Sequence, residues 1–585
     1  MCGIVGIVGR PPEDPGVIAR MTALLRHRGP DDSGVWRSPG AHLGHTRLAI
    51  LDLSSAGHQP MHLEELALTY NGEIYNFHEL RAGLAGPFRS RTDSEVILHA
   101  YRERGAKCVH GFHGMFAFAI WDERRRRLFA ARDRLGIKPL YYRPLAGALA
   151  FASEVAPLLE LGRPEIDDEA LSDYLTYSYV PTPRTPWKGI FKLGPAQTLV
   201  WQEDALRLDR YWRPEPRCSV ADLAAATAQL DELLAGIVPE HSLADVPVGV
   251  FLSGGIDSAT VTAYLDRPRT FTLGQPEAAR SEAAAARRVA VHLGTRHTEE
   301  TAEVADLAGA VDELVEVFGE PFGDSAALAV WLVSRFTSEH VKVALSGEGG
   351  DEIFCGYRWY GRAMSAPAPA WRRLSAALLP TFTLAGRSAQ RRGCADLERY
   401  ASFLGLFTPA QKRALAGPRL AAGADDLWHF RRHWRPELPF HQRLQWADLY
   451  TYLPDGMLTK VDRASMAFSL EVRPPLLDHR LVEWALTLDA ALQRDAATDR
   501  GKLVLRRLMA GRLPPGHLER PKRGFNLAIR RWARANPGLL AGALGRLAAN
   551  GIIRRPRPFS PTNEQTWALL VLDRWLRRHD GAYAS

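Results

Sequence analysis

The fold class is decided by the stretch Val250-Phe251-Leu252-Ser253-Gly254-Gly255-Ile256-Asp257-Ser258-Ala259-Thr260. The apolar run from Val248 to Leu252 predicts a buried parallel strand, and the residues from Ser258 to Leu265 predict a helix. Two glycines at such a turn let backbone amides approach a ligand, and the helix start adds the positive end of its dipole. The turn therefore suits phosphate, although it lacks the Gly-Lys-Ser/Thr ending of a Walker loop. A purely structural glycine turn in an α/β sheet fits this stretch equally well.

A second stretch has the same design. The apolar run Val341-Lys342-Val343-Ala344-Leu345 predicts another buried strand, and it leads into Ser346-Gly347-Glu348-Gly349-Gly350-Asp351-Glu352. In an open parallel sheet, ligands bind outside the carboxyl ends of the strands. Two such ends would bring Asp257 and Asp351 to one triphosphate, with Mg²⁺ held between carboxylates and phosphates.

At these two stretches the sequence resembles the asparagine synthetase family, whose members carry a Ser-Gly-Gly-x-Asp-Ser pyrophosphatase loop. The resemblance implies that ATP is cleaved to AMP and pyrophosphate while a carboxylate is adenylated. It also implies that Glu348 helps to form or aminate the acyl-adenylate and that Asp257 and Asp351 hold Mg²⁺. The implied ATP contacts are Leu252, Ser253, Gly254, Gly255, Asp257, Ser258, Leu273, Ser346 and Gly347. An ordinary core position remains an equal interpretation of Leu273.

Length and composition indicate a globular protein of two or more domains. The chain has 585 residues, of which 46% are hydrophobic and 24% charged, with a net charge of +8. The densest basic run, Arg124 to Arg127, lies between two apolar runs and predicts a solvated hairpin turn, so we expect no nucleic-acid partner. We find no signal peptide and no membrane span. The five cysteines are far apart, without zinc spacing, which favours a reducing cytoplasm.

The chain begins with a strand-like run, Cys2-Gly3-Ile4-Val5-Gly6-Ile7-Val8. Removal of the initiator methionine would leave Cys2 at the N-terminus. Its α-amine, with a typical pKa of about 7.7–8.0, could then act as the general base for its thiol. An unreactive thiol is the alternative, and Cys2 alone favours it.

Four polar motifs follow Cys2. A polar loop begins at His27, and the run from Leu43 to Asp52 predicts a strand that carries one arginine, Arg47. The dipeptide Asn71-Gly72 has the composition of a turn. Thr92-Asp93-Ser94-Glu95 predicts a capping box that places Asp93 at the first helical position, free to face a ligand. Taken singly, these residues also fit a surface ion pair, a plain hairpin turn and a complement to the helix dipole.

As a set, the motifs resemble the N-terminal-nucleophile glutaminase domain that this family carries ahead of its ATP domain. The resemblance implies that Cys2 attacks the glutamine amide and that Asn71 and the amide of Gly72 form the oxyanion hole. Arg47 would pair with the substrate carboxylate and Asp93 with its ammonium group. The implied glutamine-binding residues are Arg47, Leu48, Ala49, Ile50, Leu51, Asn71, Gly72, Glu73 and Asp93.

Downstream, Lys460 and Arg463 lie three residues apart, on one face of a predicted helix. The resemblance nominates both as the cation that neutralises charge on the reacting phosphates, Lys460 first; a solvated basic face is the alternative. A basic turn, Arg520-Pro521-Lys522-Arg523-Gly524-Phe525, also fits the family.

The expected fold is α/β, in two domains. Residues 1–205 form an αββα sandwich of the N-terminal-nucleophile hydrolase type, which is the glutaminase. Residues 206–585 form a Rossmann-like parallel-sheet ATP-pyrophosphatase domain with a helical C-terminal half, which is the synthetase. The resemblance implies that ammonia from glutamine amidates aspartyl-AMP. The alternatives are the same chemistry on another carboxylate, in sugar, peptide or natural-product biosynthesis, and a non-catalytic nucleotide-binding scaffold. The oligomeric state is open, with a homodimer as one option.

Overall fold

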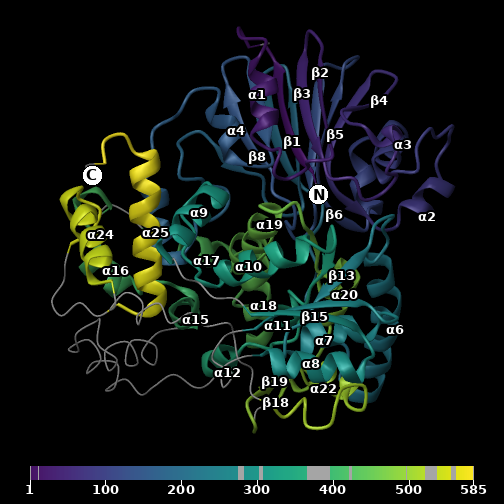
Figure 1. Ribbon diagram of the computed structural model, residues 1–585, viewed down its shortest axis with the longest axis vertical. Coiled ribbons are helices and arrows are strands. Elements are labelled where there is room, and N and C mark those ends of the chain that lie inside the picture. Colours follow the sequence, from purple (N-terminus) through teal and green to yellow (C-terminus); the bar gives the residue numbers. More distant parts are fainter. Residues whose placement is uncertain are drawn as a thin grey trace.

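The computed structural model shows an antiparallel N-terminal half above a parallel-sheet half with many helices (Figure 1). It describes residues 2–10, 12–274, 282–301, 307–364, 396–420, 425–495, 497–520, 536–554 and 561–583. The basic turn expected at 520–525 lies outside these residues apart from its first one.

Two six-stranded antiparallel sheets build the N-terminal half, in the orders β10-β8-β9-β1-β3-β2 and β12-β11-β7-β6-β5-β4. The first sheet contains β1 (Gly3–Gly9), β2 (Asp32–Arg37), β3 (Ala41–Arg47), β8 (Tyr141–Leu145), β9 (Ala148–Ala152) and β10 (Phe191–Lys192). The second contains β4 (Met61–Leu63), β5 (Leu66–Ile74), β6 (Gly114–Asp122), β7 (Arg127–Arg132), β11 (Gln197–Gln202) and β12 (Ala205–Arg210).

Helices cover the outer face of each sheet. On the first sheet lie α1 (Val17–Ala23) and α4 (Val155–Leu159), and on the second lie α2 (Phe77–Ala82) and α3 (Asp93–Arg104). Inner-face side chains, among them Ile4 of β1 and Trp121 of β6, form a fully buried core between the sheets. The αββα sandwich is therefore confirmed. Strand β1 lies between β3 and β9, so its first residues are surrounded by protein.

The second half is organised around a parallel sheet of order β15-β14-β13-β16-β17. Its strands are β13 (Val248–Phe251), β14 (Arg269–Gly274), β15 (Arg296–Thr301), β16 (Val343–Leu345) and β17 (Glu471–Arg473). The predicted strand, glycine turn and helix are confirmed, although the helix α7 (Ile256–Ala263) begins two residues earlier than expected. Strands β13 and β16 are parallel neighbours, so the glycine turns that follow them lie side by side at the carboxyl-terminal edge of the sheet.

Helices complete this half. Beside the sheet lie α6 (Leu223–His241), α8 (Ala283–His292), α10 (Ala326–Ser338), α11 (Gly350–Ile353), α20 (His479–Ala485) and α22 (Leu503–Met509). The others include α5 (Asp168–Tyr177), α12 (Arg358–Met364), α15 (Asp396–Leu404), α16 (Pro409–Leu415), α17 (Trp428–His433), α18 (Phe440–Tyr450), the π-helix η4 (Leu453–Leu458), α19 (Thr459–Met466), α24 (Pro537–Ala549) and α25 (Asn563–His579). Helix α9 (Leu307–Phe318) packs against α25 and α19, and α21 (Ala490–Gln493) packs against α22. None of the helices in the described ranges is long and apolar enough to cross a membrane.

One local expectation is wrong and another is confirmed. The dipeptide Asn71-Gly72 is not a turn, because β5 continues through it to Ile74 and pairs with β6. Gly72 is needed there for close packing, since a Cβ atom would lie 2.2 Å from the carbonyl oxygen of Met115. The run Arg124 to Arg126 is exposed in the hairpin between β6 and β7, as expected.

A buried arginine joins the two halves. Arg473, in β17, is fully buried, and its guanidinium pairs with Glu471 at 2.6 Å and with Glu73 of β5 at 2.9 Å. It also donates to the carbonyl oxygens of His241 and Leu243 at 2.9 and 2.7 Å. Each nitrogen of this guanidinium therefore has a hydrogen-bond partner, and one of these partners, Glu73, belongs to the N-terminal half.

We expect Arg473→Met to lower the free energy of unfolding by about 3–5 kcal/mol, because it leaves two buried carboxylates without their counter-charge. Equilibrium denaturation in urea measures the change. The matched control is Arg287→Met, which removes an exposed pair with Glu299 and should change stability little. Equal effects of the two variants would contradict the role of Arg473.

Candidate active sites

Cys2 lies immediately before the central strand β1 and is almost completely buried, with 9% of its surface exposed. Its backbone N–H donates to Oδ1 of Asn71 at 2.9 Å. Burial raises the pKa of the Cys2 thiol above its ordinary value, and the carboxylate of Glu471 raises it further. The thiol is therefore protonated near neutral pH and needs a base to become a nucleophile.

Asn71 has a donor that is not used. Its Nδ2 is buried and has no hydrogen-bond partner among the described residues, while its Oδ1 is held by Cys2. A buried donor without a partner costs free energy, so a functional explanation is required. An amide N–H beside a cysteine can stabilise an oxyanion that forms when the thiol attacks a carbonyl group.

Arg47 is held in place by the loop that follows it. At the end of β3, it donates to the carbonyl oxygens of Ser54 and Leu51 at 2.9 and 3.3 Å, and to that of Asp52. Gly57 leaves room for the guanidinium, because a Cβ atom there would lie 1.9 Å from Nη2. The side chain is 6% exposed and lines a pocket shared with Cys2.

Asp93 faces the same pocket from the start of α3. Thr92 caps this helix, as predicted, but Glu95 does not complete the capping box; its carboxylate accepts from the backbone of Ser90. The carboxylate of Asp93 accepts from the hydroxyl of Tyr70 at 2.6 Å and from the N–H of Ile74 at 2.9 Å. Burial raises the pKa of Asp93 to about 6.

The pocket brings together most of the expected glutamine-binding residues. It is lined by Cys2, Arg47, Leu48, Ile50, Leu51, Gly57, Gln59, Tyr70, Gly72, Glu73, Thr92, Asp93, Ser94 and Glu471. Ala49 and Asn71 are absent from this lining. The N–H of Ala49 donates to Asp31 at 2.7 Å, and Asn71 lies behind Cys2, whose N–H it binds. Glu471 belongs to β17, so the second half of the chain contributes one wall.

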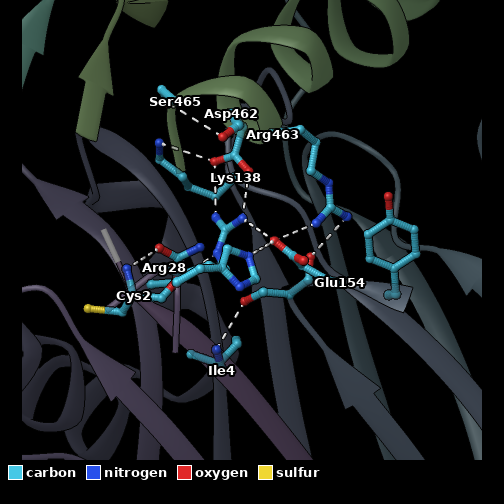
Figure 2. Close-up of polar contacts among 12 residues, drawn as sticks. Cys2, Ile4, Arg28, Lys138, Glu154, Asp462, Arg463 and Ser465 are labelled. Carbon is cyan, nitrogen blue, oxygen red and sulfur yellow. Dashed lines mark hydrogen bonds and ion pairs between the residues drawn. The ribbon is translucent and has the colours of Figure 1, made fainter. Parts of the chain in front are cut away.

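A buried charge cluster lies beneath Cys2 (Figure 2). The Nε of Arg28 donates to the carbonyl oxygen of Cys2 at 3.1 Å, while its Nη atoms contact Glu154 at 2.7 Å and Asp462 at 3.0 and 3.1 Å. Arg463 also pairs with Glu154, at 2.6 Å. Burial alone would raise the pKa of Glu154, but Arg463, His27 and Arg28 hold it well below the usual range. Asp462 of α19 thereby holds Arg28, which in turn holds the backbone of Cys2.

The second candidate site is the glycine turn after β13. Ser253 and Ser258 hold the turn closed, with a 3.0 Å bond from the Ser253 N–H and 2.9 Å between the hydroxyls. Gly255 is the residue before α7 and donates to the Ser253 hydroxyl at 3.1 Å. Gly254, Gly255 and Ser253 are partly accessible, whereas Leu252 is buried below them.

The turn after β16 packs directly against the first. A Cβ atom on Gly347 would lie 2.6 Å from the backbone nitrogen of Ser258, and one on Gly350 would lie 2.4 Å from Oδ1 of Asp257. The oxygens Ser346 Oγ and Glu348 Oε2 are buried without hydrogen-bond partners among the described residues. Orphaned polar atoms beside two converging glycine turns indicate a polar ligand.

Lys502 lies between the two acidic residues expected to bind metal. Its ammonium group is 2.7 Å from Asp257 Oδ1 and 2.7 Å from Asp351 Oδ1. The two carboxylates therefore converge on one cation position. This pair fits Mg²⁺, which is commonly held by one or two carboxylates together with substrate phosphates. No group of three or more potential metal ligands occurs in the described ranges, so the substrate would supply the remaining ones.

The two nominated cations of α19 point to different places. Lys460 pairs with Asp324 at 2.8 Å and lies 3.4 Å from the sulfur of Met457, within the second half. Arg463 turns to the N-terminal half, where it pairs with Glu154 and lies over the ring of Tyr141. Leu273, in β14, is half-buried against the hydrophobic core.

Comparisons with known proteins show the family of this chain. A glutamine amidotransferase domain matches residues 1–212, and an asparagine synthase domain matches residues 229–575. The chain belongs to the asparagine synthetase family. A relative from Mycobacterium tuberculosis that bears this family name is 36% identical over 92% of this chain and 89% of its own. Asparagine synthetase 1 of Bacillus subtilis is 30% identical over 91% and 88%, respectively.

Sequence reasoning missed several residues of this asparagine synthetase family member. Arg28 was part of a polar loop, yet it is fully buried beneath Cys2. Glu471 enters the pocket at Cys2 from a segment far along the chain, and Lys502 reaches Asp257 from 245 residues away. The opposite charges of Glu471 and Arg473 on either side of Val472, in an apolar stretch, could have indicated a buried ion pair. No feature of the sequence near Lys502 indicated its position.

We expect Asp462→Asn to lower kcat for glutamine hydrolysis, the reaction expected of Cys2, by about 10- to 100-fold, with little change in KM. The reason is that Arg28 loses a counter-charge and no longer holds Cys2 in position. Steady-state glutamate release measures both constants. The control is Lys342→Gln, which removes an exposed pair with Asp31 across the same boundary and should leave kcat unchanged. A change in KM alone would contradict this positioning role.

Proposed function

We propose that this glutamine-dependent ligase makes asparagine from aspartate, with glutamine as the nitrogen donor and ATP cleaved to AMP and pyrophosphate. The observation that carries the proposal is the pocket at Cys2, where a buried cysteine, an arginine and an aspartate converge, together with the unused amide donor of Asn71, which is bonded to Cys2. These four groups match the amide, carboxylate and ammonium groups of free glutamine.

At the first site, the thiol of Cys2 attacks the amide carbon of glutamine. Because its pKa is raised, the thiol passes its proton to a base, which is its own α-amine once the initiator methionine is removed. Asn71 Nδ2 and the N–H of Gly72 donate to the oxyanion. Arg47 and Asp93 hold the two ends of the substrate. Ammonia leaves, and water hydrolyses the thioester to glutamate.

At the second site, the aspartate side chain attacks the α-phosphorus of ATP, and pyrophosphate departs. The turn Ser253–Ser258 holds the pyrophosphate through backbone amides at the start of α7. Asp257 and Asp351 would hold Mg²⁺, which neutralises phosphate charge when bound. Ser346 and Gly347 contact AMP, and Glu348 assists formation or amination of the aspartyl-AMP.

The expected partners are small molecules, and the expected location is the cytoplasm. The described cysteines Cys2, Cys108, Cys218 and Cys355 are free, which suits a reducing compartment. In this proposal, residues 1 to about 205 hydrolyse glutamine, and the remaining residues carry out the synthesis. A homodimer, the absence of nucleic-acid binding and the role of Lys460 as the phosphate cation remain predictions.

The test is to incubate the protein with Mg-ATP, glutamine and aspartate and to measure asparagine, AMP and glutamate by mass spectrometry. We expect asparagine and AMP in equal amounts. In Cys2→Ala, glutamine should no longer support synthesis, whereas free ammonia should. Glutamate release without asparagine would leave the glutaminase intact but point to another carboxylate. Loss of both nitrogen sources in a folded variant would exclude the two-site mechanism.

We expect an acidic limb below pH 6, in which kcat/KM for glutamine falls by a further factor of about ten per pH unit, because protonated Asp93 cannot pair with the substrate ammonium group. The ionised form of Asp93 exists above this pKa, so Asp93 does not limit activity at neutral pH; protonation of the α-amine of Cys2, with a typical pKa of about 7.7–8.0, causes a separate limb at higher pH. A pH profile of glutamate release measures the effect. Asp93→Asn should be slower throughout and lack this acidic limb; a limb that persists in the variant would assign it to another group.

A further inference from the structure

A second polar cavity lies away from both sites, where the end of β12 meets α17 and α18. Its volume is about 320 Å³, which is within the range of small-molecule sites, roughly 300–1,000 Å³. It is lined by Arg210, Arg213, Arg432, His433, Arg435, Glu437, Trp446 and Tyr450. We call it the arginine pocket.

The charge of the arginine pocket is not balanced by its own residues. Four arginines line it, against one carboxylate, and that carboxylate, Glu437, is already paired with Arg435 at 2.5 Å. Burial lowers the pKa of Arg210, and the neighbouring charges of Arg213 and Arg432 lower it further. Like charges held together in this way are stabilised by an anion that enters between them.

Buried aromatic rings fix the positions of the arginines. Trp446 and Tyr450 of α18 are 3% and 6% exposed and lie 4.6 Å apart between ring centroids. The guanidinium of Arg435 lies 4.8 Å from the centre of Trp446, and that of Arg210 lies 5.0 Å from the centre of Tyr450. Cation–π contacts of this kind hold guanidinium groups in place and leave their edges available to a ligand.

One polar atom at the floor of the arginine pocket has no ordinary partner. The hydroxyl of Tyr450 is buried and makes no hydrogen bond of good geometry with the described residues, although Arg210 and Arg213 lie beside it. His433 stacks on Tyr450 at 5.3 Å, and burial lowers the pKa of His433 to about 3, so it is neutral. A hydroxyl and several guanidinium edges thus converge on one cavity.

We propose that the arginine pocket binds a small phosphate-bearing anion with at least two negative charges. Guanidinium groups match phosphate oxygens with paired N–H donors, and several of them together select a multiply charged group. The concave shape and the aromatic floor favour a small molecule over an extended polyanion, which would need a flat or grooved basic surface. No residue of this pocket belongs to either active site described above.

The position of the arginine pocket connects it to both halves. Arg210 ends the last strand of the N-terminal sheets, whereas Trp446 and Tyr450 lie on α18. After α18 the chain passes through η4 into α19, which carries Lys460 on one side and the Arg28-binding Asp462 on the other. An anion in the pocket would therefore contact the boundary between the halves and the helix that leads to α19.

Isothermal titration with inorganic pyrophosphate, in EDTA, tests the proposal. The full-length protein is compared with Arg213→Gln/Arg432→Gln, which alters two exposed pocket residues, and with Arg26→Gln/Arg124→Gln, which removes the same charge from exposed surface elsewhere. We expect the pocket variant to lose one site or to bind there at least tenfold more weakly. The surface variant should bind as the unaltered protein does. Equal weakening in both, or no change in the pocket variant, would overturn the proposal.

Ser253→Ala separates this pocket from the phosphate turn. If both sites bind pyrophosphate, each variant removes a different one. Binding that is lost only in Ser253→Ala would reject the arginine pocket and support the turn, whereas binding lost only in Arg213→Gln/Arg432→Gln would support the pocket and count against the turn. A pocket variant that loses affinity for heparin but keeps it for pyrophosphate would identify a polyanion surface, which contradicts a small-molecule site.

Discussion

The structure depends on keeping buried charges paired across the boundary between its halves. Arg473 is fully buried, and a guanidinium in that setting is tolerated only when carboxylates and carbonyl oxygens surround it. One of its carboxylates, Glu73, follows Asn71 and Gly72, the proposed oxyanion residues, in β5. The position of β17 is therefore tied to a strand that lines the pocket at Cys2, and Glu471 enters that pocket because it shares β17 with Arg473.

The same constraint holds α19 against both halves of the chain. Arg28 holds the backbone of Cys2, but its guanidinium is buried and needs Glu154 and Asp462 as partners. Asp462 comes from α19, whose Lys460 faces Asp324 in the synthetase half. A short helix with charges on two sides thus forms ion pairs with both halves.

Much of the fold was predictable because its signals are local. A run of apolar residues followed by glycines predicts a strand and a turn wherever it occurs, and β13 and β16 confirm this. Thr92 caps α3 because a hydroxyl one position before a helix satisfies a free N–H there. The local signal failed at Asn71-Gly72, where pairing with β6 kept the chain extended despite its turn composition.

The sequence by itself determined the α/β class, the nucleophile candidate and the two glycine turns, since each depends on residues close together in the chain. Only the tertiary structure decided which charges meet. Asp462 is 434 residues from Arg28, and Lys502 is 245 residues from Asp257. It also turned Arg463 toward Glu154 and away from Lys460, three residues earlier on the same helix. The physical reason is that a buried charge must find its partner wherever folding brings one, and helical spacing carries no information about that partner.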